Sequence, residues 1–126
     1  MSNRTAKIIK EILRLLFSQT AINDGIKDKQ FKIPIHLAMG HESIAVAVNA
    51  IMSKNDKLIL SYRNIAYNLT RLHALRDIWN EYALKPTGLN QRKSGSMNLA
   101  KAKQMFRWYL EVGLEEGLET YSPLFI

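Results

Sequence analysis

The sequence has 126 residues, the length of one domain, with 47% apolar and 23% charged residues, which excludes an intrinsically disordered chain. It has no cysteine, which excludes disulfides, thiolate metal sites and a cysteine nucleophile. Four glutamates are the only charges after Arg107, so the net charge of +7 becomes +11 for residues 1–110. This excess suits nucleic acid, an anionic membrane or a phosphorylated ligand. Because no basic cluster is interleaved with aromatic residues, we do not expect nucleic-acid binding.

Apolar residues at helical spacing predict an amphipathic helix over residues 5–17. Its apolar face packs on a core or a partner, although a basic amphipathic helix also suits a membrane surface. The segment lacks the unbroken apolar block of a secretory signal, so we expect a soluble, cytoplasmic protein. The Asn-Asp-Gly sequence at residues 23–25 predicts a turn, and the lysine-rich residues that follow predict a solvated loop.

Residues 32–36 predict extended chain, because Pro34 disfavours helix at the residue before it. His36, at the end of this segment, is either a satisfied core histidine or a catalytic group. Residues 42–52 are apolar on nearly every side, which predicts a helix buried all round, and they are fewer than the ~20 needed to span a bilayer. Glu42 at the start of this helix either accepts from first-turn amides or has a catalytic role.

Residues 57–62 predict a short buried strand, and Tyr62 and Arg63 lie at its end. Ligands of open α/β sheets gather at the carboxyl ends of strands. A guanidinium binds a phosphate through two hydrogen bonds, and the tyrosine hydroxyl adds a third, so this pair is a candidate anion site. Pairing of Arg63 with a surface carboxylate is the alternative.

Two helices are predicted over residues 64–84, then a flexible loop over residues 87–97 that carries Arg92 and Lys93, and a helix over residues 100–118. The loop cations suggest anion or nucleic-acid binding as a further hypothesis. The three histidines are not spaced for a metal site, and no serine elbow, P-loop or dinucleotide glycine motif is present.

Three motifs then occur in order: IHLAMGHES at residues 35–43, SYRN at residues 61–64 and LKPTGLNQRKSGSMN at residues 84–98. Their order and spacing resemble the alpha subunits of thiamine-diphosphate-dependent 2-oxo acid dehydrogenases, the decarboxylating components for pyruvate, branched-chain 2-oxo acids and acetoin. The resemblance covers about residues 8–100. It implies that residues 1–100 are the amino-terminal part of an alpha-subunit domain, and that residues 101–126 are a tail without family resemblance. The expected fold is mainly α with one short strand, a truncated piece of the α/β thiamine-diphosphate-binding fold.

The resemblance also implies residue roles. His36 resembles the catalytic histidine that faces the cofactor's reactive carbon and contacts the 2-oxo acid, and Tyr62 and Arg63 resemble the pair that binds the cofactor's phosphate end. The implied cofactors are thiamine diphosphate and magnesium, and the implied partners are a beta subunit and a lipoyl acyltransferase, with no nucleic acid and no membrane. The implied reaction is oxidative decarboxylation with acyl transfer to lipoamide, an oxidoreductase activity.

The sequence also departs from this pattern. Ile65 stands where the family commonly has a histidine, and the Gly-Asp-Gly segment and the asparagine that coordinate magnesium are missing, so no metal ligand is assigned. A diphosphate is usually held by a divalent ion. We therefore expect a chain that is truncated and inactive alone, with a tail produced by a frameshift or premature stop. The alternative is a noncatalytic helical interaction module that uses the face of residues 8–17.

Overall fold

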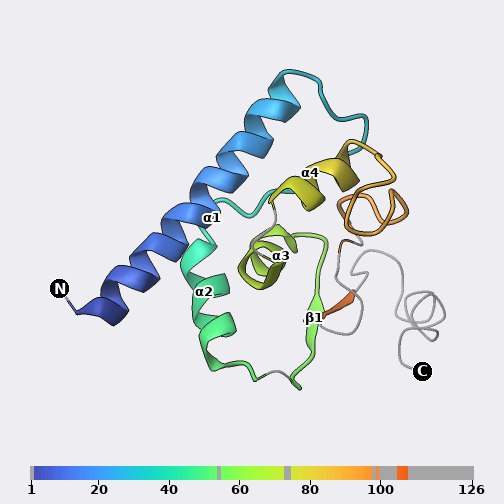
Figure 1. The fold of residues 1–126 in the computed structure, drawn as a ribbon. Coiled ribbons are helices and arrows are strands. Elements are labelled where there is room, and N and C mark those ends of the chain that lie inside the picture. Colours follow the sequence, from blue (N-terminus) through green and yellow to red (C-terminus); the bar gives the residue numbers. More distant parts are fainter. Residues whose placement is uncertain (1, 54, 73–74, 98, 100–104, 108–126) are drawn as a thin grey trace.

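The computed structural model describes residues 2–53, 55–72, 75–97, 99 and 105–107, and this part of the chain is mainly helical (Figure 1). The helices are α1 (Asn3–Lys27), α2 (Glu42–Ile51), α3 (Ile65–Leu72) and α4 (Leu75–Tyr82). The predicted mainly helical fold class is confirmed, and so are the two helices expected over residues 64–84. None of the helices in the described residues combines the length and the apolar character needed to cross a bilayer.

Two three-residue strands lie side by side in the described part of the chain, β1 (Leu58–Leu60) and β2 (Met105–Arg107). They are parallel, with Ile59 opposite Phe106. The sequence predicts β1 but not β2, because β2 falls in a stretch whose spacing favours a helix. The helix expected over residues 100–118 is therefore wrong at residues 105–107, and the rest of that prediction, like most of the predicted tail, lies outside the described residues.

α1 is longer than the sequence predicts and continues through residues 23–25, so the predicted turn there is wrong. The Ser2 hydroxyl accepts from the Thr5 amide at 3.2 Å and caps the start. The helix ends at Lys27 and not at residue 17, and beyond it Gln30 N donates to Gly25 O and Lys29 takes a φ of 56°. Gly25 serves close packing against Phe31 and Trp79 and does not make a turn.

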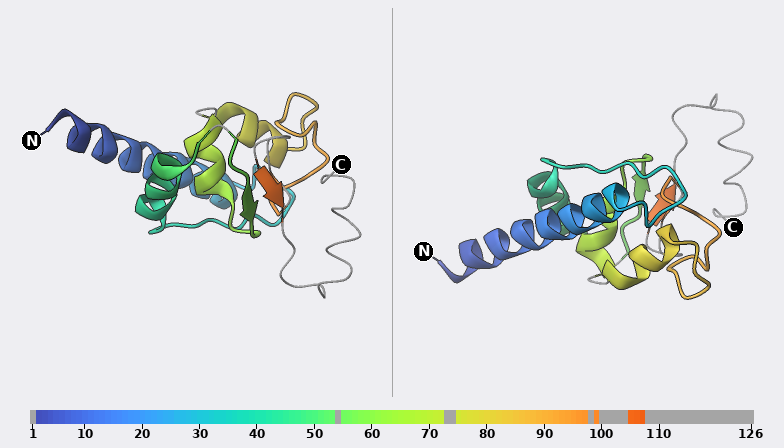
Figure 2. Two further views of the ribbon diagram at one scale, coloured as in Figure 1. Left: turned by 90° about the horizontal axis from the view of Figure 1, so that it is seen from below. Right: turned by 90° about the horizontal axis from the view of Figure 1, so that it is seen from above.

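The core lies where α1 crosses α2 and α3, with α4 beside them (Figures 1 and 2). Its buried apolar side chains come from all four helices, from the segment between α1 and α2 and from one later residue; they include Leu15, Ile22, Ala38, Ala45, Ile65, Leu69, Ile78, Tyr82 and Leu99. This packing fixes the segment between α1 and α2, which carries His36, against the segment after β1, which carries Tyr62 and Arg63.

The prediction that α2 is buried all round is wrong. Among its residues only Glu42, Ala45 and Val46 are buried, whereas Ile44 is 51% and Ile51 85% exposed. The apolar residues of α2 lie on two faces of the helix. One face packs on α1 and α3, and the other is exposed to solvent in the described part of the chain. Burial all round would need cover on both sides.

Candidate functional site

The structure brings together the three site residues predicted from the sequence. The rings of His36 and Tyr62 meet edge to face with centroids 4.9 Å apart, and the guanidinium carbon of Arg63 lies 5.5 Å from the centre of the Tyr62 ring. Tyr62 therefore contacts both the histidine and the arginine. The two segments that meet here are 26 residues apart in sequence.

The histidine segment is held at both ends. Gln19 of α1 accepts from the Ala38 amide and donates to the Glu42 carboxylate, each at 2.8 Å. Ser96 donates through its hydroxyl to the Pro34 carbonyl. Glu42 is buried and accepts from the Gln19 side chain, whereas no hydrogen bond from a first-turn amide to Glu42, as expected from the sequence, is present in the described residues. These bonds fix the course of the chain on either side of His36.

Arg63 is tied to the same segment, since its Nη1 donates to the Leu37 carbonyl at 2.9 Å. This hydrogen bond joins the guanidinium to a backbone carbonyl, whereas the alternative prediction required a surface carboxylate as its partner. Arg63 is exposed, and one bond to a carbonyl leaves its positive charge uncompensated by that partner. The arginine is thus oriented and still able to bind an anion.

Two buried side chains that sequence reasoning missed hold the loop of residues 87–97 close to the site. The side-chain nitrogen Nδ2 of Asn64 lies 3.1 Å from the carbonyl oxygens of Ser96 and of Met97. The Glu81 carboxylate accepts from the amides of Asn90, Arg92 and Ser94 at 2.8, 2.8 and 2.9 Å. The loop predicted as flexible is therefore fastened at several points.

The site contains one polar atom without a partner. Nδ1 of His36 is buried and has no hydrogen-bond partner in the structure. Buried polar groups are normally satisfied, so this ring nitrogen is an exception in the site. The exposed guanidinium of Arg63, in contact with the same tyrosine, fits an anion. In the described residues no group of three or more histidine or carboxylate side chains is placed to hold a metal ion.

Comparison with known proteins gives partial matches. No family model matches the chain. It is 29% identical over 89 residues to the pyruvate dehydrogenase E1 component alpha subunit of Dictyostelium discoideum, a match that covers 71% of this chain and 24% of that protein. It is 29% identical over 105 residues to the alpha-2 subunit of Arabidopsis thaliana, covering 83% and 27%. The chain thus spans about a quarter of the length of these relatives, and the matches support a relationship with the E1 alpha-subunit family in general.

Proposed function

We propose that this chain contributes the amino-terminal part of a thiamine-diphosphate-dependent 2-oxo acid dehydrogenase alpha subunit, with His36, Tyr62 and Arg63 in the cofactor and substrate site. The observation that carries the proposal is that the Tyr62 ring contacts both His36 and Arg63, and that these residues come from two separate segments. The mitochondrial relatives are named as pyruvate dehydrogenase alpha subunits, and pyruvate is accordingly the substrate we propose.

In this proposal Arg63 and Tyr62 hold the phosphate end of the cofactor, and His36 presents its ring to the reacting centre. Thiamine diphosphate supplies the electron sink for decarboxylating a 2-oxo acid. The diphosphate also needs a divalent ion, for which the described residues offer no ligand cluster. We therefore propose that this chain is truncated and inactive alone. A complete site would also need the beta subunit, and acyl transfer would need the lipoyl acyltransferase.

The first experiment titrates the chain with inorganic pyrophosphate and follows its amide signals by NMR. We expect shifts at Tyr62 and Arg63 that disappear in Arg63→Gln. The matched control is Arg76→Gln on α4, an exposed arginine outside the site. Shifts that survive Arg63→Gln would contradict the assignment.

The second experiment titrates the chain calorimetrically with thiamine diphosphate and magnesium. We expect no micromolar binding by this chain alone and no decarboxylation of pyruvate. Tight binding or turnover would overturn the proposed incompetence. The cytoplasmic location predicted from the sequence stays a prediction. The relatives named above are mitochondrial, and cell fractionation would distinguish the two locations for this chain.

A second candidate function is a noncatalytic interaction module, which the outer face of α1 favours. Ile9 and Leu13 are each 43% and Phe17 is 66% exposed, and the three line one shallow groove. Ile12 packs against the core, so Leu13→Asp is the better probe of this face. A loss of partner binding or of oligomer mass in Leu13→Asp on size exclusion supports the module, and an unaltered mass counts against it.

A further inference from the structure

One buried residue touches both of the segments that form the candidate site. Ser96 is 4% exposed. Its hydroxyl donates to the carbonyl of Pro34, which lies two residues before His36. Its own carbonyl accepts at 3.1 Å from Nδ2 of Asn64, which lies two residues after Tyr62. Ser96 therefore joins the segment that carries the histidine to the segment that carries the tyrosine.

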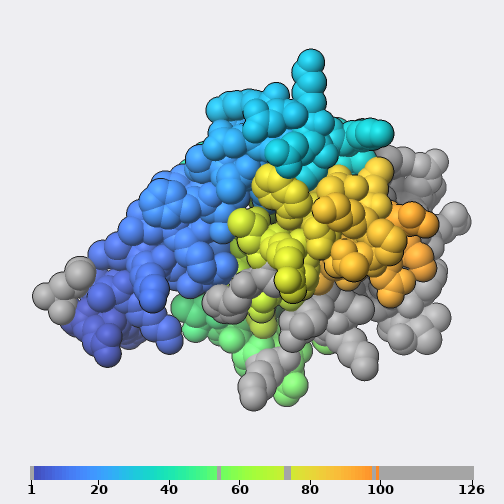
Figure 3. Space-filling model, turned by 45° about the horizontal axis from the view of Figure 1, so that its top comes forward, coloured from blue at the N-terminus to red at the C-terminus, as the bar shows by residue number. Residues whose placement is uncertain are grey.

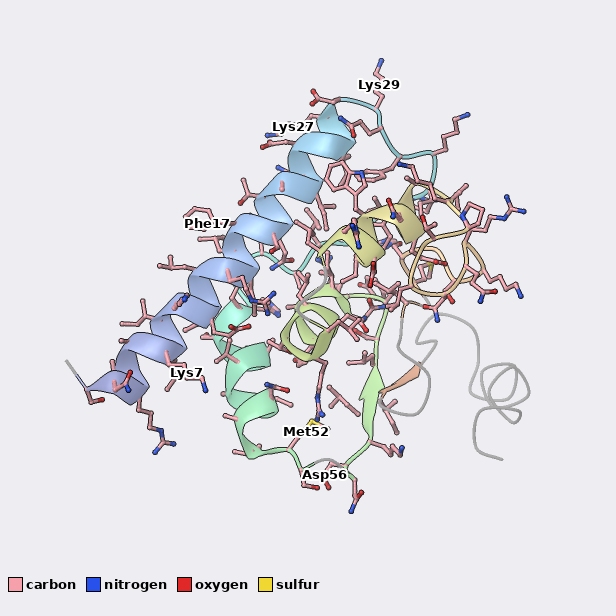
Figure 4. The ribbon with its side chains drawn as sticks, in the orientation of Figure 1. Lys7, Phe17, Lys27, Lys29, Met52 and Asp56 are labelled. Atoms are coloured by element: carbon pink, nitrogen blue, oxygen red, sulfur yellow. The ribbon has the colours of Figure 1, made fainter. Side chains whose placement is uncertain are left out.

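The loop of residues 87–97 brings Ser96 to this position. In Figure 3 the loop, in orange, lies against α4, in yellow, and the Glu81 carboxylate of α4 accepts from three of its amides. In Figure 4 the chain turns at Lys29, beyond the end of α1, and then passes α4 on its way back to α2. Because this return segment carries Pro34, the loop meets it beside α4.

The backbone is restrained on both sides of the hydrogen bond between Ser96 and Pro34. Gly95 takes a φ of 56°, in the left-handed region that a glycine adopts without strain. A Cβ there would lie 3.6 Å from Cδ1 of Ile33, so the loop backbone lies close to the segment before His36. The proline ring holds φ at about −65°. Because that angle is fixed, a hydrogen bond that restrains the proline carbonyl sets the direction in which the chain continues toward the histidine.

In the described residues the other side-chain hydrogen bonds to this segment are made after His36. Gln19 accepts from a backbone amide there at 2.8 Å, and Arg63 donates to a backbone carbonyl at 2.9 Å. Ser96 is thus the side chain that holds the segment before the histidine. Loss of its hydroxyl would free that side and leave the other bonds in place, so the histidine ring could shift.

We propose that Ser96 is a positioning residue that sets the contact between the His36 and Tyr62 rings, whose centroids are 4.9 Å apart. It acts through its two hydrogen bonds, one to each segment. The consequence for catalysis rests on the proposed function, in which these rings form part of the cofactor and substrate site. In such a site a displacement of a reacting group by about 1 Å lowers the rate on the order of a hundredfold.

Two substitutions remove the hydroxyl and keep the carbonyl that accepts from Asn64. Ser96→Ala deletes it, and Ser96→Cys replaces it with a weaker donor, so that a second variant is available if the alanine packs poorly. We expect nuclear Overhauser cross-peaks between the His36 and Tyr62 rings in the parent chain and their loss in both variants. The matched control is Thr70→Val, which removes another buried hydroxyl, one that donates within α3 at 2.8 Å, and it should keep the cross-peaks.

Cross-peaks that persist in Ser96→Ala and Ser96→Cys, or that the parent chain itself lacks, would overturn the inference. An equal loss in Thr70→Val would also overturn it, because general loosening of the core would then explain the result. Pyrophosphate added to the same samples separates this inference from the proposed function. Absence of shifts at Arg63 in the parent chain counts against the proposed function, whereas the ring cross-peaks, which need no ligand, still decide the role of Ser96.

Discussion

Gly25 of α1 lies directly against the indole of Trp79 in α4. A Cβ at Gly25 would stand 2.6 Å from Cη2 of Trp79 and 2.8 Å from Cε2 of Phe31, both closer than real Cβ atoms approach. The two rings cannot both step aside easily, because they pack edge to face with centroids 4.8 Å apart. This glycine lets the end of α1 approach α4.

We therefore expect Gly25→Ala to destabilise the protein by about 1–3 kcal/mol through overpacking. The usual gain of about 1 kcal/mol for alanine over glycine in a helix is too small to offset the clash. Urea unfolding at 25 °C measures the difference. Asp24→Ala, at the exposed neighbouring position, serves as the control and should change the stability little. A Gly25→Ala variant as stable as the parent would contradict the packing argument.

Glu81 is the acceptor for three loop amides, and a glutamine there keeps only one acceptor oxygen and no charge. We expect Glu81→Gln to lower the free energy of unfolding by about 2 kcal/mol, since hydrogen bonds to charged groups are the stronger kind. The loosened loop should also be cut faster by trypsin after Arg92 and Lys93. Cleavage after the exposed Lys29, outside the three bonds, is the internal control. Equal acceleration at all three positions would indicate general unfolding instead.

Asn64 holds the other end of the same loop. Its side-chain nitrogen Nδ2 donates toward the Ser96 and Met97 carbonyls, and its Oδ1 accepts from the side chain of Asn68 at 3.0 Å. Asn64→Leu removes the side-chain donor to the Ser96 and Met97 carbonyls and one of the acceptors of Asn68. We expect a loss of about 3 kcal/mol in chemical unfolding, because buried acceptors are left unsatisfied. Asn80→Ala, which removes an exposed hydrogen bond to Thr87, should cost far less. Similar losses in both variants would show that burial of the Asn64 contacts is unimportant.

The sequence predicts the helices and the candidate site better than it predicts burial. Helical spacing locates α1 to α4, and the motif resemblance picks out His36, Tyr62 and Arg63, which the structure brings into contact. Spacing cannot tell whether an apolar face is covered, so α2 was expected to be buried all round.

Long-range partners account for the other errors. In the sequence Gly25 predicts a turn, because its packing against Trp79 is visible only in the folded structure. Glu81 looks like any polar residue on a helix, yet it is 0% exposed, because its acceptor role depends on a loop that folds back over it. Strand β2 depends on β1, more than forty residues earlier, for its hydrogen bonds, and no local pattern predicts it.

Tyr82 is 1% exposed and packs edge to face on Phe31. Burial, followed by the neighbouring Glu81 carboxylate, raises the pKa of Tyr82 above the ordinary value of 10.0. The folded state therefore favours the neutral, protonated form more strongly than the unfolded state does. This contribution is fully present below pH 10 and is lost as the pH rises above that value, because the unfolded state then releases a proton that the folded state keeps.

We accordingly expect the free energy of unfolding to fall steeply above pH 10 in the parent chain and less steeply in Tyr82→Phe, which has no proton to release. Urea unfolding at a series of alkaline pH values measures both slopes. Neutral pH provides the control, because the tyrosine is protonated there in both states and any difference between the proteins reflects only the lost hydroxyl. Parallel slopes above pH 10 would mean that other groups govern alkaline unfolding and that ionisation of Tyr82 is not coupled to the core.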